Sequence, residues 1–85
     1  MLSTSETLPW LRTLVRETLQ VPESEEIDRR TLTELGLGSL QAVALQFRIL
    51  RETSVRIEMG ALVGGHRLVE VAELIDANRS AVQHN

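Results

Sequence analysis

Hydrophobic and polar positions recur with helical periodicity in three stretches of the chain. The first stretch predicts a helix from about Glu6 to Leu19, with Ser5 before it as an N-cap. Pro9 falls in the first turn, where its missing N–H does little harm. Polar side chains such as Arg12 and Arg16 take one face. The opposite, apolar stripe consists of Leu8, Leu11, Leu14, Val15 and Leu19.

The second stretch predicts a helix from Ser39 or Leu40 to about Glu52 that is apolar on two sides. A helix of this kind is either deeply buried or offers one side to a partner. For Leu45 and Ile49, both burial by the other helices and contact with a partner stay open. One side consists of Leu40, Val43, Ala44, Phe47 and Leu50, and the other of Ala42, Leu45 and Ile49.

The third stretch predicts a closing helix from Leu68 to about Asn78, followed by a frayed tail over 80–85. Its apolar residues face the core, whereas Glu70, Glu73 and Asp76 face water. The apolar set consists of Leu68, Val71, Ala72 and Ile75.

Two connections separate these helices. The segment 20–38 is long and begins acidic, and four apolar residues would anchor it to the core: Ile27, Leu32, Leu35 and Leu37. A loop of this length in a small domain is usually functional or disordered, and the anchors favour function. The segment 53–57 is predicted to be extended. Met59, Leu62 and Val63 then predict a short helix that ends at Gly64 and Gly65.

These elements predict an all-α fold, a small four-helix bundle of three main helices and a short third helix. The 85 residues would form a single domain, with an ordered core over about 6–78. The hydrophobic content of 42% is sufficient for one core, which must be largely aliphatic because the chain has one Trp, one Phe and no Tyr.

Composition and charge exclude several classes of protein. The chain has no Cys, which rules out disulfides and thiolate chemistry and fits a reducing, cytoplasmic location. Its net charge is -3 and its arginines are scattered, so nucleic acid is an unfavourable partner. This also disfavours a helix-turn-helix DNA binder around Gly36 to Gly38. The apolar runs are too short to span a membrane, and we expect the isolated domain to be a monomer.

Ser39 stands after Gly38 at the head of the second helix, and this position has several interpretations. An N-cap is the simplest, although the capping box is absent because Ala42 occupies the third helical position. A nucleophile is disfavoured, since the elbow motif requires glycine two residues before and after the serine. Nothing in the sequence orients His66 or His84 against Ser39, and we expect both histidines on the surface.

The stretch LTELGLGSLQAVALQFRI resembles the modification site of acyl and peptidyl carrier domains, which have a serine at the start of their second helix. The similarity covers most of the chain. It includes the first helix, the long anchored loop, the short third helix and a closing helix that contains RLVEVAELI. One departure is Gly38, where the family usually has Asp or His.

The resemblance implies that Ser39 carries a 4′-phosphopantetheine arm, attached by a phosphopantetheinyl transferase that uses coenzyme A. The arm would hold acyl or aminoacyl groups as thioesters, and the domain would carry them between enzymes without catalysing a reaction. Partner enzymes would contact the surface near the arm at Leu37, Gly38, Leu40 and Met59.

The type of carrier is indicated by the second helix. Fatty-acid carriers typically present an acidic second helix, but here the first acidic residue after Ser39 is Glu52. The helix, and the stretch VRIEMGALVGG, are more similar to carriers of polyketide synthases and nonribosomal peptide synthetases. The alternative is an unmodified helical interaction module, in which Ser39 is only an N-cap and Leu40 contacts a partner.

Overall fold

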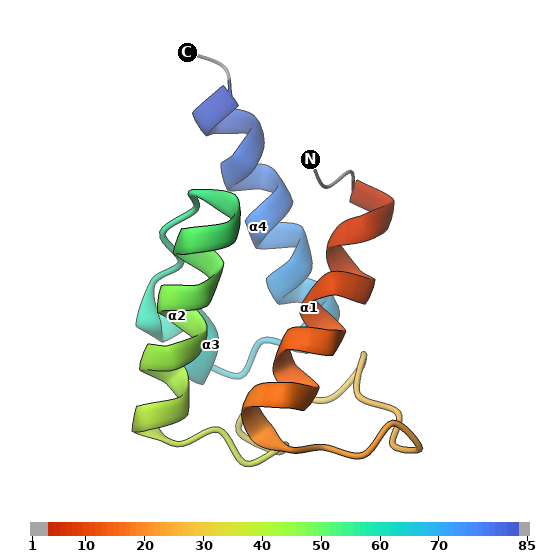
Figure 1. Ribbon diagram of the computed structural model, residues 1–85. Coiled ribbons are helices and arrows are strands. Elements are labelled where there is room, and N and C mark those ends of the chain that lie inside the picture. Colours follow the sequence, from red (N-terminus) through yellow and green to blue (C-terminus); the bar gives the residue numbers. More distant parts are fainter. Residues whose placement is uncertain (1–3, 84–85) are drawn as a thin grey trace.

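A computed structural model describes the backbone of residues 4–83 and the side chains of residues 6–79. The described part contains four helices: α1 (Thr4–Leu19), α2 (Ser39–Thr53), α3 (Met59–Val63) and α4 (Leu68–Gln83). α1 packs against both α4 and α2, and α3 packs against α2 (Figure 1). The predicted all-α bundle of three main helices and one short helix is therefore confirmed.

Both terminal helices are longer than predicted. α1 begins at Thr4, so Ser5 lies inside the helix and is not its N-cap. α4 continues to Gln83, five residues beyond the predicted end at Asn78. The prediction of a frayed tail is wrong for residues 80–83, because this segment contains no Gly or Pro that would end a helix. His84 and Asn85 lie outside the described residues.

The core is aliphatic and receives side chains from every helix, from the α1–α2 loop and from the α2–α3 connection. The predicted stripes of α1 and α4 supply its centre, with Leu8 and Leu19 half-buried at its edge. Buried hydrophobic residues are Leu11, Leu14, Val15, Ile27, Leu32, Leu37, Ala42, Leu45, Ile49, Val55, Ile57, Leu62, Leu68, Val71, Ala72 and Ile75.

The two apolar sides of α2 have different environments. Ala42, Leu45 and Ile49 are buried, so contact between a partner and Leu45 or Ile49 is excluded. Leu40 and Phe47, on the other side, are exposed. The physical reason is that α1 and α3 pack against the side of α2 that carries Ala42, Leu45 and Ile49. The opposite side of α2 is left uncovered.

The long loop between α1 and α2 is fastened to the bundle by buried side chains and by an ion pair with α1. Ile27, Leu32 and Leu37 are buried and Leu35 is half-buried, which confirms the predicted anchors. The guanidinium of Arg12 donates to both carboxylate oxygens of Asp28, at 2.9 Å and 2.8 Å.

The same loop also completes the start of α4. The carbonyls of Asp28 and Arg30 accept hydrogen bonds from the N–H groups of Val69 (3.1 Å) and Leu68 (3.0 Å). N–H groups in the first turn of a helix have no partner within the helix, so the loop satisfies donors that would otherwise be unpaired.

One polar residue of α4 differs from its predicted environment. Asp76 does not simply face water, because it is half-buried and accepts a hydrogen bond of 2.6 Å from the hydroxyl of Thr7. Thr7 is completely buried, and a buried hydroxyl requires such a partner. The contact joins the first turns of α1 to the middle of α4.

The connection from α2 to α3, residues 54–58, contains no helix, but the predicted extended segment 53–57 is wrong at its start: Thr53 is the last residue of α2, and Ser54 ends the helix with a left-handed φ of 63°. Val55 and Ile57 point into the core, and the amide of Gln46 donates to the carbonyl of Ile57 at 2.9 Å. α3 occupies the predicted positions, and Gly65 follows it with a φ of 92°. None of the helices in the described part of the chain is long and apolar enough to cross a membrane.

Candidate functional site

The end of the long loop forms a single helical turn that starts at Thr31. The N–H of Thr31 donates to Oε1 of Glu34 (3.0 Å), and the N–H of Glu34 donates to the hydroxyl of Thr31 (3.2 Å). These reciprocal bonds form a capping box, which satisfies donors at the start of the turn. The turn therefore has a defined beginning even though it is too short to be an independent helix.

The same turn ends in a Schellman motif centred on Gly36. The N–H of Leu37 donates to the carbonyl of Leu32 (3.0 Å), and the N–H of Gly36 donates to the carbonyl of Thr33 (3.1 Å). Gly36 has a φ of 100°, a conformation that side chains disfavour. Leu32 and Leu37, the two positions that often carry a hydrophobic contact in this motif, are both buried in the core. The motif directs the chain outward just before Ser39.

The residue that caps α2 is Gly38, and the prediction that Ser39 is the N-cap is wrong. Gly38 is extended, with φ -104° and ψ -179°, and its carbonyl accepts the first helical bond, from the N–H of Ala42 (2.9 Å). The side chain of Gln41 accepts a bond from the N–H of Gly38 at 3.1 Å. Half of a capping box is therefore present, shifted by one residue from the predicted register.

Ser39 is consequently the first residue of α2, and its side chain is exposed. The N–H groups in the first turn of α2 have no carbonyl partner within the helix, and the helix dipole places partial positive charge there. This environment suits an anionic group such as a phosphate ester. The hydroxyl of Ser39 can therefore be reached from solvent and stands where an attached phosphate would be stabilised.

A cavity of about 420 Å³ opens beside Ser39, between α2 and α3. Its lining contains no charged side chain, and most of it is apolar. Three of the predicted partner contacts line it: Leu37 is buried, Gly38 is exposed and Met59 is half-buried. The fourth, Leu40, is exposed and is not part of the lining. Lining residues are Thr33, Leu37, Gly38, Ser39, Ala42, Val43, Met59 and Val63.

The sequence predicts that Met59, Leu62 and Val63 wall the region beside the arm; Met59 and Val63 do line the cavity, whereas Leu62 is buried in the core. Sequence reasoning did not single out Thr33 or Val43 as part of this site. Val43 lies one helical turn after Ser39, so the i, i+4 spacing could have suggested it. Thr33 had no comparable signal, because its place depends on the turn that precedes Gly36.

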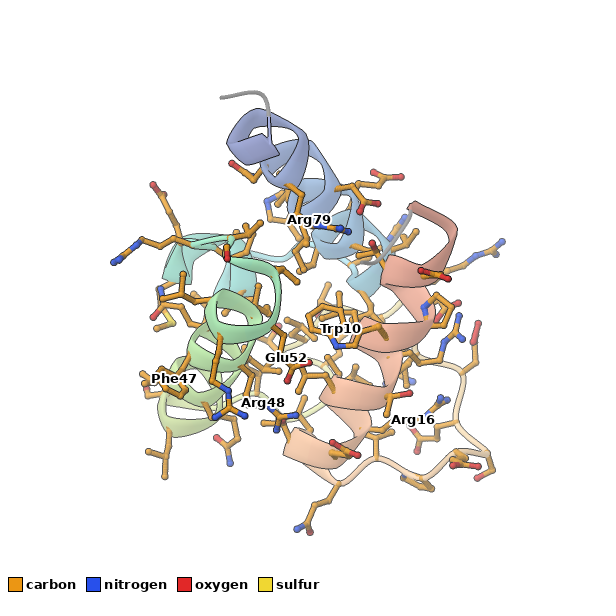
Figure 2. All side chains as sticks on the ribbon, turned by 45° about the horizontal axis from the view of Figure 1, so that its top comes forward. Trp10, Arg16, Phe47, Arg48, Glu52 and Arg79 are labelled. Carbon is orange, nitrogen blue, oxygen red and sulfur yellow. The ribbon has the colours of Figure 1, made fainter. Side chains whose placement is uncertain are left out.

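Near the end of α2, the carboxylate of Glu52 forms a hydrogen bond to α1. Glu52 accepts a hydrogen bond from the indole N–H of Trp10 (2.9 Å) and another from Nε of Arg48 (3.1 Å). In Figure 2, Glu52 lies between these two side chains. The bond from Trp10, followed by that from Arg48, lowers the pKa of the Glu52 carboxyl. The only acidic residue of α2 is thus hydrogen-bonded to other side chains of the same molecule.

No arrangement suited to catalysis accompanies Ser39 in the described residues. His66 is exposed, and its Nδ1 lies 4.0 Å from Oε1 of Glu70, four residues further along the chain. His84, the other candidate, lies outside the described residues. The part of the chain that the structure describes also contains no group of His, Cys, Asp and Glu that could hold a metal ion.

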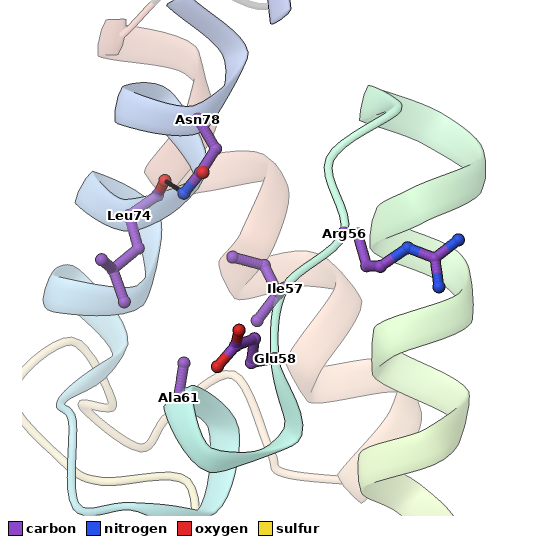
Figure 3. Close-up of a pocket in the computed structure, with 6 residues that line it drawn as sticks. All are labelled: Arg56, Ile57, Glu58, Ala61, Leu74 and Asn78. Carbon is purple, nitrogen blue, oxygen red and sulfur yellow. Dashed lines mark hydrogen bonds between the residues drawn. The ribbon is translucent and has the colours of Figure 1, made fainter. Parts of the chain in front are cut away.

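A second cavity, of about 290 Å³, lies between the α2–α3 connection and α4 (Figure 3). Figure 3 shows Arg56 directed towards α2, whereas Leu74 and Asn78 approach from α4. This cavity shares no lining residue with the one beside Ser39. It therefore does not extend the Ser39 site.

Comparison with known proteins gives one match. Residues 9–75 match the family described as "Phosphopantetheine attachment site". No curated protein and no solved structure matches the chain.

The matched region contains the Schellman turn, the start of α2 and the apolar cavity, and these features fit a covalently attached phosphopantetheine group. An exposed hydroxyl at a helix N-terminus accommodates the phosphodiester, and the uncharged cavity offers space beside it. Because the family match extends over most of the chain, the protein belongs to the phosphopantetheine-attachment-site family and is a non-catalytic carrier domain with a 4′-phosphopantetheine prosthetic group.

Proposed function

We propose that Ser39 is the residue to which phosphopantetheine is attached. The observation that carries this proposal is the position of its exposed hydroxyl, at the first residue of α2 and at the mouth of the apolar cavity. The Schellman turn at Gly36 directs the chain outward there, so a phosphopantetheinyl transferase can reach the hydroxyl without unfolding the core.

The attached arm supplies a terminal thiol, on which acyl or aminoacyl groups are carried as thioesters. The chain's own residues orient and expose the attachment point. Gly38 and Gln41 set the start of the helix, and the N–H groups of the first turn stabilise the phosphate. Leu40 lies next to the arm and is available to the enzymes that load or unload it.

The assembly line that uses this carrier is of the polyketide or nonribosomal peptide type. What supports this is the surface of α2, which presents apolar and basic side chains and no acidic residue before Glu52. Glu52 itself is bonded to Trp10 and Arg48. Residues 1–85 act as one cytoplasmic, monomeric carrier domain.

Intact-mass measurement tests the attachment site. The chain is incubated with coenzyme A and a broad-specificity phosphopantetheinyl transferase, and we expect the mass to increase by one phosphopantetheine group. Ser39→Ala should abolish the increase. Ser24→Ala, at an exposed serine of the long loop, is the matched control and should be modified like the wild type. If the Ser39→Ala variant were still modified, Ser39 would be rejected as the attachment site.

Absence of modification in the wild type would favour an unmodified helical interaction module instead.

The type of assembly line is tested on the modified protein. Acyltransferases of polyketide synthases and adenylation enzymes of peptide synthetases are each offered the carrier, with a fatty-acid malonyl transferase for comparison. We expect loading by the first two classes to exceed loading by the third, and the reverse order would contradict the proposed type.

A further inference from the structure

We propose that the cavity between the α2–α3 connection and α4 binds an arginine side chain of a partner protein. Glu58 pairs with the guanidinium, and the apolar part of the lining holds the aliphatic stem. The site shares no lining residue with the cavity beside Ser39, so it does not rest on the proposed function. It gives the domain a place of contact that leaves the start of α2 uncovered.

The size and the lining of the cavity suit a single side chain. Its volume is about 290 Å³, at the lower limit of the range of about 300–1,000 Å³ that is usual for small-molecule sites. The buried Ile57 and the half-buried Ala61 and Leu74 supply apolar surface. A long side chain with a charged head can pack its stem on such a surface and keep the head near solvent.

The charged group that faces the cavity is the carboxylate of Glu58. Glu58 is the cap residue of α3, but its side chain makes no cap hydrogen bond. Among the side chains that the structure describes, it also has no hydrogen-bond or ion-pair partner. Figure 3 shows Glu58 directed towards α4, whereas Arg56 is directed towards α2. The complementary ligand is therefore a cation.

Asn78 supplies a second acceptor on the opposite side of the cavity. Its Nδ2 donates to the carbonyl of Leu74 at 2.8 Å, one turn earlier on α4, which leaves Oδ1 to accept from a ligand. A guanidinium has five N–H donors in a planar fork and can donate two bonds to one carboxylate. The ammonium of lysine is a point charge without this fork. Two acceptors of this kind therefore favour arginine.

The neighbouring arginines of the chain are not the occupants of this cavity. Arg56 is directed away from it, and Arg79 lies 3.9 Å from the carboxylate of Asp76 with its side chain 11% exposed. A second copy of the chain is also a poor occupant, because each copy has a net charge of -3 and two acidic molecules repel each other. The charge favours a different, basic protein.

The experiment titrates the full chain with capped tripeptides at constant ionic strength and follows amide shifts by NMR. The peptides are identical except for a central arginine, lysine or citrulline, and citrulline has nearly the shape of arginine without its charge. We expect the arginine peptide to shift the amides of 57–61 and 74–78. It should bind about threefold or more tightly than the citrulline peptide, as for an exposed ion pair.

Variants of the lining test the role of charge. Glu58→Gln should weaken binding of the arginine peptide by about twofold to fivefold, and Arg56→Gln should strengthen it by about twofold because a like charge is removed. Glu73→Gln makes the same change as Glu58→Gln at an exposed acid of α4 outside the lining, and should have little effect.

Several results would overturn the proposal. Equal binding of the arginine and citrulline peptides, or unchanged binding by Glu58→Gln, would exclude the ion pair. A lysine peptide that binds as tightly as the arginine peptide would exclude recognition of the guanidinium. Tighter binding of free L-arginine than of the peptide would assign the cavity to a small molecule.

Two further measurements separate this site from the proposed function and from self-association. Ser39→Ala should bind the arginine peptide like the wild type, so a failure of the attachment experiment leaves this result unaffected. Sedimentation without peptide should show a monomer at all concentrations. Association that disappears in Glu58→Gln would assign the cavity to a second copy and reject the partner proposed here.

Discussion

The backbone N–H of Gly38 donates a hydrogen bond to Oε1 of Gln41 at 3.1 Å, and through this contact α2 begins at Ser39 with Gly38 as its cap. A glycine cap has no side chain to offer the helix. Gln41 supplies the reciprocal half of a capping box, because it accepts from the N–H of the cap residue, whereas no cap side chain accepts from the N–H groups of the first turn.

Gly38→Asp should stabilise the domain slightly. The φ of -104° is accessible to any residue, so glycine is not required for backbone reasons. The new Cβ would lie 2.8 Å from Oε1 of Gln41, a flexible side-chain end that can move away. The Asp carboxylate then caps the first turn and interacts favourably with the dipole, which together contribute about 0.5 kcal/mol.

Thermal unfolding should show this as a rise in Tm of about 2 °C. Gly38→Asn is the neutral control, which keeps the cap and lacks the charge. We also expect faster phosphopantetheine transfer to Gly38→Asp. Slower transfer would mean that the transferase recognises the turn only with glycine in it.

Gly36→Ala should destabilise the domain by about 1 kcal/mol or more, because its φ of 100° is unfavourable for a residue with a Cβ. The space around Gly36 is open, so the cost lies in the backbone and not in a clash. Gly60→Ala is the matched control, since its surroundings are equally open and it lies inside α3. Denaturant unfolding should find Gly60→Ala as stable as the wild type or slightly more stable.

Leu62→Ala should cost about 2–5 kcal/mol, the range for removing a fully buried leucine side chain. Leu62 is 1% exposed, whereas its neighbour Val63 is 43% exposed. Val63→Ala should therefore change the free energy of unfolding by less than about 0.5 kcal/mol. Similar losses in the two variants would contradict the placement of α3 against the core.

The ion pair between Arg12 and Asp28 predicts a specific dependence of stability on pH. The hydrogen bonds from Arg12 lower the pKa of the Asp28 carboxyl in the folded state. The stabilisation is therefore fully present above the unfolded pKa of about 3.9, and is lost as the pH falls through the lower folded pKa.

At neutral pH, Asp28→Asn should be less stable than the wild type by about 0.5–1 kcal/mol. Below the folded pKa this difference should shrink, which urea unfolding at a series of pH values can measure. Glu25→Gln, at an exposed acid of the same loop, controls for the change in net charge. A difference that stays constant with pH would show that the pair contributes nothing through its charge.

Local sequence determined the helices and the turn before Ser39. The apolar spacing in α1 and α4 predicted which side of each helix is buried, because each has one dominant stripe. Gly36, with its φ of 100°, allows the sharp turn before Ser39, and the predicted anchors Ile27, Leu32 and Leu37 lie in the core. Such features depend on neighbours within one or two turns, which the sequence displays directly.

Tertiary structure decided what depends on distant residues. α2 has two apolar sides of similar character, and only the packing of α1 and α3 determines that Leu45 is buried and Phe47 is exposed. The partners of Thr7 and Trp10 are Asp76 and Glu52, which lie 69 and 42 residues away in sequence. No local pattern encodes these pairs, because a polar side chain is compatible with many partners until the helices around it are in place.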